Sequence, residues 1–512
     1  MIFHKPSHRT LCALSLSLLF SATGCSGEDG ESIWSFGSGQ TAATEDEYWV
    51  VNYLQDSKVG HVHNVVKLVE RDGEQLVQRV SDGHIEMRRG GAKITQKIRV
   101  ESTETKGGKP ISFETKMTTG NESMVTRGTV KGDKLELAVT TKGTTKTSTI
   151  VWEDGWGGMF GTEVSLLQQP MKPGETRTIK RLEPILNDVV TETLEAVKME
   201  KTKVGNSTEN LLLIKSKVQM KNMSIEQKAW ADEEGNLIKG LMPTMQLVWY
   251  RADKQTALAK GEIGSFDLWD STVVKLDKAP SRPHETKQVV YRVELEQADP
   301  KDVFSNCLSQ TVRSTGRRTA DITVRAIRPN SPTTIPDEVN DKPTEKDLAP
   351  NNLIQSDDGR VVAMANSVLS SEKDSWRLAV AMENFVGRKM RTAGFTQAFA
   401  TAAEVAESLE GDCTEHAVLL AALCRARKIP ARVAMGLVYY PPQKGLAYHM
   451  WTEVWIDDRW IPLDATLARG GIGGGHLKLS HSNLDGADAY STFLPVIQVM
   501  GQLKAQVVSS EY

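Results

Sequence analysis

The first half of the chain consists of short runs in which polar and apolar residues alternate. Residues 48–54, 92–100 and 211–218 are clear examples. An alternation with period two is typical of a β-strand with one buried and one solvated face. Turn-forming pairs separate the runs: Asp72-Gly73, Gly90-Gly91, Gly107-Gly108, Gly132-Asp133 and Gly235-Asn236. This punctuation predicts a large antiparallel all-β domain over residues 46–276.

The pattern changes after this region, which indicates a chain of several domains. Two more β-like runs predict a small β unit over residues 285–329. Residues 330–355 gather prolines among acidic and polar residues and are predicted to be a linker. Helical spacing then begins after a Ser/Asp start at 371–374 and continues through Trp376, Ala379, Val380, Met382, Glu383 and Val386. A second, Ala-rich helix is predicted over residues 397–409.

The N-terminus has the pattern of an export signal. Lys5 and Arg9 precede an uncharged, Leu-rich stretch that is too short to span a bilayer, so residues 1–24 are predicted to be a signal peptide. Small residues stand immediately before Cys25, an arrangement that resembles the lipobox of bacterial lipoproteins. The resemblance implies that Cys25 is lipidated and becomes the mature N-terminus. Ordinary cleavage that leaves Cys25 as a plain thiol is the alternative.

The segment after Cys25 and the export signal together predict the location of the protein. Residues 25–45 consist mainly of Gly, Ser, Thr and Glu and are predicted to be a flexible tether. We therefore expect an exported protein that is lipid-anchored to the bacterial cell envelope, facing the periplasm or in the outer membrane, and otherwise secreted.

Length and charge exclude some classes of protein. The 512 residues leave room for about three domains with sizeable cores. The chain has 62 Lys and Arg against 65 Asp and Glu, a formal net charge of −3, and no block of basic residues stands out. Because nucleic-acid binding needs a concentration of positive charge against the phosphates, we expect no nucleic-acid partner.

The first candidate for chemistry is Cys413. Gly411 is expected to end the preceding helix and Asp412 is a good N-cap, so Cys413 falls in the first turn of a new, mostly apolar helix. The positive end of that helix stabilises a thiolate. The alternative is that Cys413 is only a small buried apolar residue. A disulfide to Cys424 is excluded, because the two residues would lie about 16 Å apart on one helix, beyond the ~7 Å limit.

A predicted β-hairpin assembles two further candidates. Residues 448–456 and 459–464 are strand-like and are joined by a two-residue turn at 457–458. Trp455 then opposes Trp460, and His449 and Asp464 become diagonal neighbours on one face, about 7–8 Å apart. The opposite face is apolar and core-like: Met450, Val454, Ile456, Ile461 and Leu463. Trp451 and Trp455 share the face of His449 and either line a substrate tunnel or pack as aromatics.

Cys413, His449 and Asp464 are the residue types that thiol acyl transfer requires. A thiolate attacks a carbonyl, an imidazole holds and returns the proton, and a carboxylate fixes the orientation of the imidazole. A structural strand histidine and a turn aspartate are the alternative. The only oxyanion donor that the sequence indicates is the backbone N–H of Cys413.

Several motifs resemble the transglutaminase-like superfamily: Gly411 to Cys413, residues 428–433, residues 449–454 and residues 460–466. The resemblance covers about residues 374–467. It implies a papain-like α+β core within residues 356–512, with Cys413 as nucleophile, His449 as base and Asp464 as orienting acid. Met450 and Ala465 depart from the common Ala and Pro of the family, and neither removes a catalytic group.

The resemblance implies an enzyme that acts on amide bonds of protein or peptide substrates, namely a cysteine protease, an amidase or a transglutaminase, with no cofactor. We favour hydrolysis, since transamidation requires a site that excludes water and binds an amine. The alternative function is a non-catalytic envelope binding or assembly protein whose β domain does the work.

Two other sites are weighed and disfavoured. A zinc site would draw on Cys413, His416, His449, His476 and His481, but no CxxC or HExxH spacing supports it. The glycines of residues 470–475 lack the Lys-Ser/Thr ending of a phosphate loop and are predicted to form a flexible rim near the site.

Overall fold

The computed structural model describes residues 43–89, 92–119, 122–141, 143–183, 186–220, 223–259, 272–280, 282–329, 331, 341–391, 400–485 and 494–512. The chain divides into two compact units that meet in sequence near residue 266. The predicted signal peptide, the lipidation site Cys25 and residues 25–42 of the tether lie outside the described residues. Among the residues described, none of the helices has the length and apolar character needed to cross a membrane.

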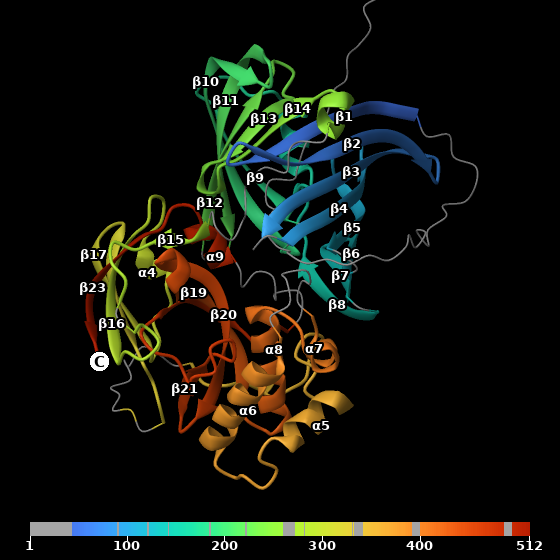
Figure 1. Cartoon of the computed structure of the whole chain (residues 1–512). Coiled ribbons are helices and arrows are strands. Elements are labelled where there is room, and N and C mark those ends of the chain that lie inside the picture. The colour runs from blue at the N-terminus through green and yellow to red at the C-terminus, as the bar shows by residue number, and fades with distance from the viewer. Residues whose placement is uncertain are drawn as a thin grey trace, which may run out of the picture. The chain divides into compact units, whose positions relative to one another are not determined.

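The first unit is built on one 14-stranded sheet, which confirms the predicted antiparallel β region (Figure 1). Neighbouring strands follow the order β8-β7-β6-β5-β4-β3-β2-β1-β14-β13-β12-β11-β10-β9. The bounds are β1 (Ala43–Leu54), β2 (Ser57–Arg71), β3 (Glu74–Arg89), β4 (Ala92–Thr105), β5 (Pro110–Thr119), β6 (Glu122–Lys131), β7 (Lys134–Thr141), β8 (Thr144–Val151), β9 (Thr176–Glu183), β10 (Asp188–Val204), β11 (Ser207–Met220), β12 (Met223–Ala231), β13 (Leu237–Met242) and β14 (Leu247–Ala252).

The turn chemistry read from the sequence sets the local pairing of this sheet. Asp72 and Gly73 both have positive φ, 53° and 79°, and join β2 to β3 with Arg71 opposite Glu74. β1 also pairs with β14, so one sheet contains both halves of the region. Two short helices, α1 (Gly161–Gln168) and α2 (Lys254–Leu258), and the 3-10 turn η2 (Pro243–Met245) lie between strands.

The second unit holds two smaller sheets and most of the helices (Figure 1). One sheet has the order β17-β18-β16-β23, and the other has the order β15-β20-β19-β22 with β21 paired to β20. The strand bounds are β15 (Val274–Lys275), β16 (Gln288–Glu294), β17 (Gln310–Gly316), β18 (Thr319–Arg325), β19 (Ala431–Tyr440), β20 (Gly445–Ile456), β21 (Arg459–Leu463), β22 (His476–Ser482) and β23 (Lys504–Glu511). The helices are α4 (Pro300–Val303), η3 (Glu345–Asp347), α5 (Gly359–Ser367), α6 (Ser375–Lys389), α7 (Ala402–Ser408), α8 (Cys413–Ala426), η4 (Pro441–Gln443) and α9 (Leu494–Val499).

The small β unit predicted over residues 285–329 shares its sheet with the end of the chain. β16 pairs with β18 and also with β23, which starts at Lys504. Sequence alternation shows that a segment forms strands, but it does not show which distant strand completes the sheet.

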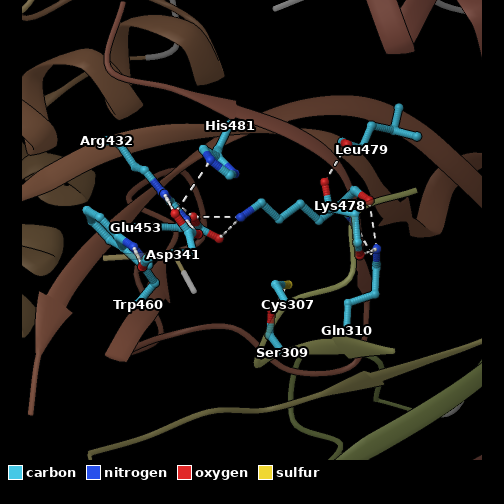
Figure 2. Close-up of polar contacts among 11 residues, drawn as sticks. Cys307, Ser309, Gln310, Asp341, Arg432, Glu453, Trp460, Lys478, Leu479 and His481 are labelled. Atoms are coloured by element: carbon cyan, nitrogen blue, oxygen red, sulfur yellow. Dashed lines mark hydrogen bonds and ion pairs between the residues drawn. The ribbon is translucent and has the colours of Figure 1, made fainter. Parts of the chain in front are cut away.

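The described part of the predicted linker packs against the helical domain. The Asp341 carboxylate accepts two hydrogen bonds from the Arg432 guanidinium, at 2.8 and 2.6 Å, and the Asp341 carbonyl accepts one from the Trp460 indole N–H at 2.8 Å (Figure 2). Ile354 is fully buried in the core. Because Arg432 is buried, it needs carboxylate partners, and Asp341 supplies one of them.

Helix α8 forms the centre of the helical domain. Its residues from Ala417 to Cys424 are nearly or fully buried, and they share one apolar cluster with α5, α6, α7 and the strands β19 to β21. The Thr452 hydroxyl on β20 donates to the Ala417 carbonyl of α8 at 3.0 Å. The apolar face of the predicted hairpin, including Met450 and Val454, packs into this cluster as expected.

Leu420→Ala is expected to destabilise the second unit by about 2–5 kcal/mol, because the side chain is fully buried and its removal leaves a cavity beside rigid neighbours. Leu348→Ala, at a side chain that is 40% exposed, should change the free energy of unfolding by no more than about 0.5 kcal/mol. The free energy of unfolding of each variant is measured by urea denaturation, with hydrogen exchange in the peptide that contains α8 as the signal. Equal effects of the two substitutions would contradict the central place of α8.

Candidate active site

The start of helix α8 places Cys413 at its first turn, as predicted. Asp412 is the N-cap: its carboxylate accepts the Thr414 N–H at 2.8 Å, and its own N–H donates to Glu415 at 2.9 Å. Gly411 has φ 153°, and a Cβ at that position would lie 2.4 Å from the Glu415 side chain. The Gly-Asp pair therefore fixes where the helix begins, and Cys413 is its first residue.

The hairpin that carries the other two candidates has the predicted register. Asp457 and Asp458 form a two-residue turn with φ of 51° and 55°, and Trp455 lies opposite Trp460. β21 ends at Leu463, so Asp464 is the first residue after the strand. This register brings the His449 imidazole to the Asp464 carboxylate, with Nε2 2.9 Å from Oδ2.

The structure brings all three predicted catalytic residues together. His449 forms side-chain hydrogen bonds with both Asp464 and Cys413. Since Nε2 faces Asp464, Nδ1 is the ring nitrogen available to the thiol. All three residues are buried, with exposed fractions of 9% for Cys413, 8% for His449 and 1% for Asp464.

The charge state of the group follows from its surroundings. Burial alone lowers the pKa of His449, but its interactions with Asp464 and with Cys413 outweigh burial and hold this pKa well above its usual value. Burial raises the pKa of Asp464, but the facing His449 and the hydrogen bonds from His449 and His476 hold it well below the ordinary value. The arrangement therefore favours an ionised aspartate beside an imidazolium.

The carboxylate of Asp464 is held on both oxygens. Oδ1 accepts the backbone N–H of Thr466 at 2.9 Å. Oδ2 faces two imidazoles, with His449 Nε2 at 2.9 Å and His476 Nε2 at 3.0 Å. With both oxygens engaged, Asp464 is fixed in the orientation in which it holds His449.

Glu383 on helix α6 positions the loop that carries Asp464, and the sequence interpretation gave it no such role. Its carboxylate accepts the backbone N–H groups of Asp464 at 2.9 Å, Gly470 at 2.8 Å and Gly471 at 3.2 Å. The side chain is fully buried, and burial raises its pKa to about 7, while the backbone donors lower it in part. A charged residue inside the apolar stripe of a helix was the available signal.

Glu383→Gln is expected to lower amide-hydrolysing activity by about 10–100-fold, because an amide nitrogen cannot accept the N–H groups that set the position of Asp464. Glu407→Gln, at an α7 side chain that is 69% exposed, should leave activity unchanged. Steady-state hydrolysis of a peptide amide by the two purified variants measures the difference. Full activity of Glu383→Gln would show that the loop keeps its place without this carboxylate.

The two predicted substrate-lining tryptophans have different surroundings. Trp451 is 2% exposed, and its ring stacks with His449 at 6.3 Å and meets His476 edge-on at 5.2 Å. Trp455 is half-buried and packs edge-on against Trp460 at 5.5 Å. Trp451 therefore lies beside the triad, whereas Trp455 packs against the other strand of the hairpin.

The other cysteines have different environments. Cys307, Cys413 and Cys424 are all free thiols. Burial raises the pKa of Cys424 to about 12, with a smaller contribution from the charge of Glu383, so Cys424 is a protonated core residue. Cys307 is half-buried, with its sulfur 3.4 Å from the Ser309 hydroxyl (Figure 2).

The glycine run differs from the flexible rim that we predicted. Gly471 to Gly475 are buried. A Cβ at Gly473 would lie 2.6 Å from the His284 backbone, and a Cβ at Gly475 would lie 3.1 Å from the His284 ring. The glycines therefore allow a close backbone approach between two packed loops beside the site.

Two of the four histidines of the disfavoured zinc site, His449 and His476, lie together at Asp464, and the other two lie elsewhere. Within the described residues, one group of three potential ligand side chains is close enough to share an ion: His449, Asp464 and His476. The two hydrogen bonds to Asp464 Oδ2 already account for this grouping. His416 instead bonds the Asp412 carbonyl through Nδ1 at 2.6 Å, and His481 lies 4.0 Å from Asp341.

A protein-family model matches part of the second unit. Residues 362–465 match the family model of the transglutaminase-like superfamily. The second unit therefore carries a transglutaminase-like domain, which follows the all-β region in the chain. No curated protein matches the chain in sequence.

Three solved structures are similar to parts of the chain. A candidate cysteine protease from Cytophaga hutchinsonii is 18% identical and covers 44% of this chain and 90% of its own, with a TM-score of 0.30. A β-barrel-like protein of a domain of unknown function from Brucella abortus is 9% identical and covers 40% and 95%, with a TM-score of 0.30. A candidate protease from Parabacteroides distasonis is 11% identical and covers 73% and 68%, with a TM-score of 0.18. Similarity this low carries no weight for the function.

Proposed function

We propose that the protein is a thiol acyl-transfer enzyme that hydrolyses amide bonds of protein or peptide substrates through Cys413, His449 and Asp464. The observation that carries this proposal is the chain of hydrogen bonds from Cys413 to His449 and from His449 to Asp464, at the start of a helix in a transglutaminase-like domain. Every group that the first chemical step needs is present in this chain.

In the proposed acylation step, Cys413 reacts as a thiolate beside the imidazolium of His449. The Cys413 thiolate forms a bond to the carbonyl carbon of the amide, and the π electron pair moves to the carbonyl oxygen, where the Cys413 backbone N–H is the donor that we assign. The imidazolium of His449 then gives its Nδ1 proton to the leaving amine, and the C–N bond breaks. A thioester on Cys413 and a neutral His449 remain.

Deacylation reverses the proton movement. Neutral His449 takes a proton from water as the water oxygen bonds to the thioester carbon. The C–S bond breaks, the carboxylic acid product leaves, and the thiolate and imidazolium are restored. Asp464 stays ionised throughout and stabilises the imidazolium.

Hydrolysis and transamidation differ only in what resolves the thioester. We expect free carboxylate or new peptide ends to form from casein faster than a labelled primary amine is incorporated, since no feature of the described site selects an amine over water. Faster amine incorporation would assign a transglutaminase activity instead. The proposal would be overturned if neither product formed and no acyl group were found on Cys413.

We also propose export and anchoring through a lipid on Cys25. The pattern of residues 1–25 supports this proposal. In cells fed a labelled fatty acid, the full-length protein should carry label and sediment with membranes, and Cys25→Ser should abolish both. An unlabelled protein in the soluble fraction would contradict it.

The alternative, a binding or assembly role of the β region, is supported by the extent of the 14-stranded sheet and by its edge strands β8 and β9. This alternative would replace the enzymatic proposal if Cys413→Ala left the cellular role of the protein unchanged while removal of the β region abolished that role.

A further inference from the structure

We propose that His476 is a positioning residue of this active site, which shares Asp464 Oδ2 with the catalytic His449 and keeps that carboxylate ionised and oriented. The inference deepens the proposed function and rests on it. It adds a side chain to the triad and Glu383, from a strand that the predicted hairpin does not contain.

The geometry of the sheet places His476 at the site. His476 is the first residue of β22 and lies opposite Val438 on β19. His449 on β20 lies opposite Gly436 of the same strand β19. The two imidazoles thus come from strands on either side of β19, and their ring centroids are 5.8 Å apart. Both reach the same oxygen, at 2.9 and 3.0 Å.

The protonation state of His476 follows from its contacts. Asp464 is an acceptor when ionised, so His476 donates from Nε2–H. Burial lowers the pKa of His476, against the raising effect of Asp464, so the ring is neutral and Nδ1 carries a lone pair. Nδ1 is buried and has no hydrogen-bond partner within the described part of the chain. A neutral donor stabilises the carboxylate without a second positive charge that would compete with the His449 imidazolium.

The groups around His476 come from several elements. Asp464 faces it from the loop after β21, and His449 and Trp451 face it from β20. His284, from the segment before β16, contacts it edge-on at 5.8 Å between ring centroids, and burial lowers the pKa of His284 to about 4. Asp464 and His449 are therefore the charged neighbours that set the protonation state of His476 around neutral pH.

Matched substitutions separate positioning from packing. His476→Gln keeps an N–H near the place of Nε2, whereas His476→Leu fills similar space without a donor. We expect His476→Leu to lower kcat for amide hydrolysis by about 10–100-fold with little change in KM, because Asp464 and through it His449 lose their orientation. The acid limb of its pH profile should move to higher pH, because Asp464 then accepts a proton more readily. His476→Gln should keep kcat within about threefold of wild type and should leave the acid limb of the pH profile in place.

Two controls keep the test decisive. His481→Gln, on the same strand but beside Asp341, should leave kcat and the pH profile unchanged. If His476→Leu does not fold, His476→Asn replaces it, since its shorter amide does not reach Asp464. Equal losses in His476→Gln and His476→Leu, or no loss in either, would overturn the proposal.

A spectroscopic measurement separates this inference from the proposed function. In full-length protein labelled with ¹⁵N-histidine, we expect His476 to remain in the neutral Nε2–H form at neutral pH, even in an inactive Cys413→Ala variant. A charged ring or the Nδ1–H form would overturn the role of His476 whether or not the protein is an enzyme. The expected tautomer in a protein without amide hydrolysis would leave the positioning contact standing and remove only the proposed activity.

Discussion

Cys413→Ala is expected to lower amide hydrolysis by about 10⁴-fold or more, the largest effect of any single substitution. The reason is that Cys413 supplies the only bond to the acyl group, and neither of the other two cysteines in the described residues can replace it. Cys424 is fully buried with its pKa raised to about 12, and Cys307 lies beside Ser309. Initial rates of peptide amide hydrolysis, with purified wild type and variant at equal folded concentration, measure the effect.

The matched control is Cys307→Ala, which removes a half-buried thiol outside the triad. It should retain wild-type activity. His449→Ala should lose nearly as much as Cys413→Ala, and the double variant should lose little more, because residues that act as one unit are not additive. A Cys413→Ala variant with more than a tenth of the wild-type rate would show that the activity comes from elsewhere.

Asp464→Asn is expected to lower kcat/KM by about 10³–10⁴-fold and to change the pH dependence. An amide in place of the carboxylate removes the negative charge that holds the pKa of His449 well above its usual value. Acylation needs the imidazolium to protonate the leaving amine, so activity is lost on the alkaline side as His449 loses its proton. In wild type this loss falls well above pH 6.5, and in Asp464→Asn it should move toward lower pH.

The pH profile of kcat/KM for a peptide amide measures this shift. Asp458→Asn is the matched control, since Asp458 lies in the exposed hairpin turn with φ 55°, a conformation that Asn adopts readily. It should leave rate and profile unchanged. An alkaline limb at the same pH in wild type and Asp464→Asn would mean that Asp464 does not set the charge of His449.

The parts of the site that the sequence predicted depend on contacts close in the chain. Asp412 caps the helix that Cys413 begins, and the pairing of His449 with Asp464 follows from a two-residue turn and the alternation of strand faces. Local chemistry decides both, so the residue pattern was sufficient. The order of strands in the large sheet could not be predicted in the same way, because β1 pairs with β14, nearly 200 residues later in the chain. Val51 lies opposite Tyr250 in this pairing.

The missed residues belong to distant segments. Glu383 reaches Asp464 from a helix 81 positions earlier, and His476 approaches across β19 from a strand that follows the glycine run. The spacing of residues along the chain does not reveal which loop will donate its backbone N–H groups to a carboxylate on a helix. A charged residue in an apolar stripe and a histidine after buried glycines were the only signals, and each has more than one interpretation.

The most direct test of the central proposal is intact-protein mass spectrometry after a short exposure to a cysteine-directed acylating probe at neutral pH. Wild type, Cys413→Ala and His449→Ala should be compared as chains without residues 1–25. We expect a single label on Cys413, formed much faster than any label on Cys307 and lost in His449→Ala. Labelling of Cys413 no faster than that of Cys307, or labelling that persists in His449→Ala, would contradict an activated nucleophile at the start of α8.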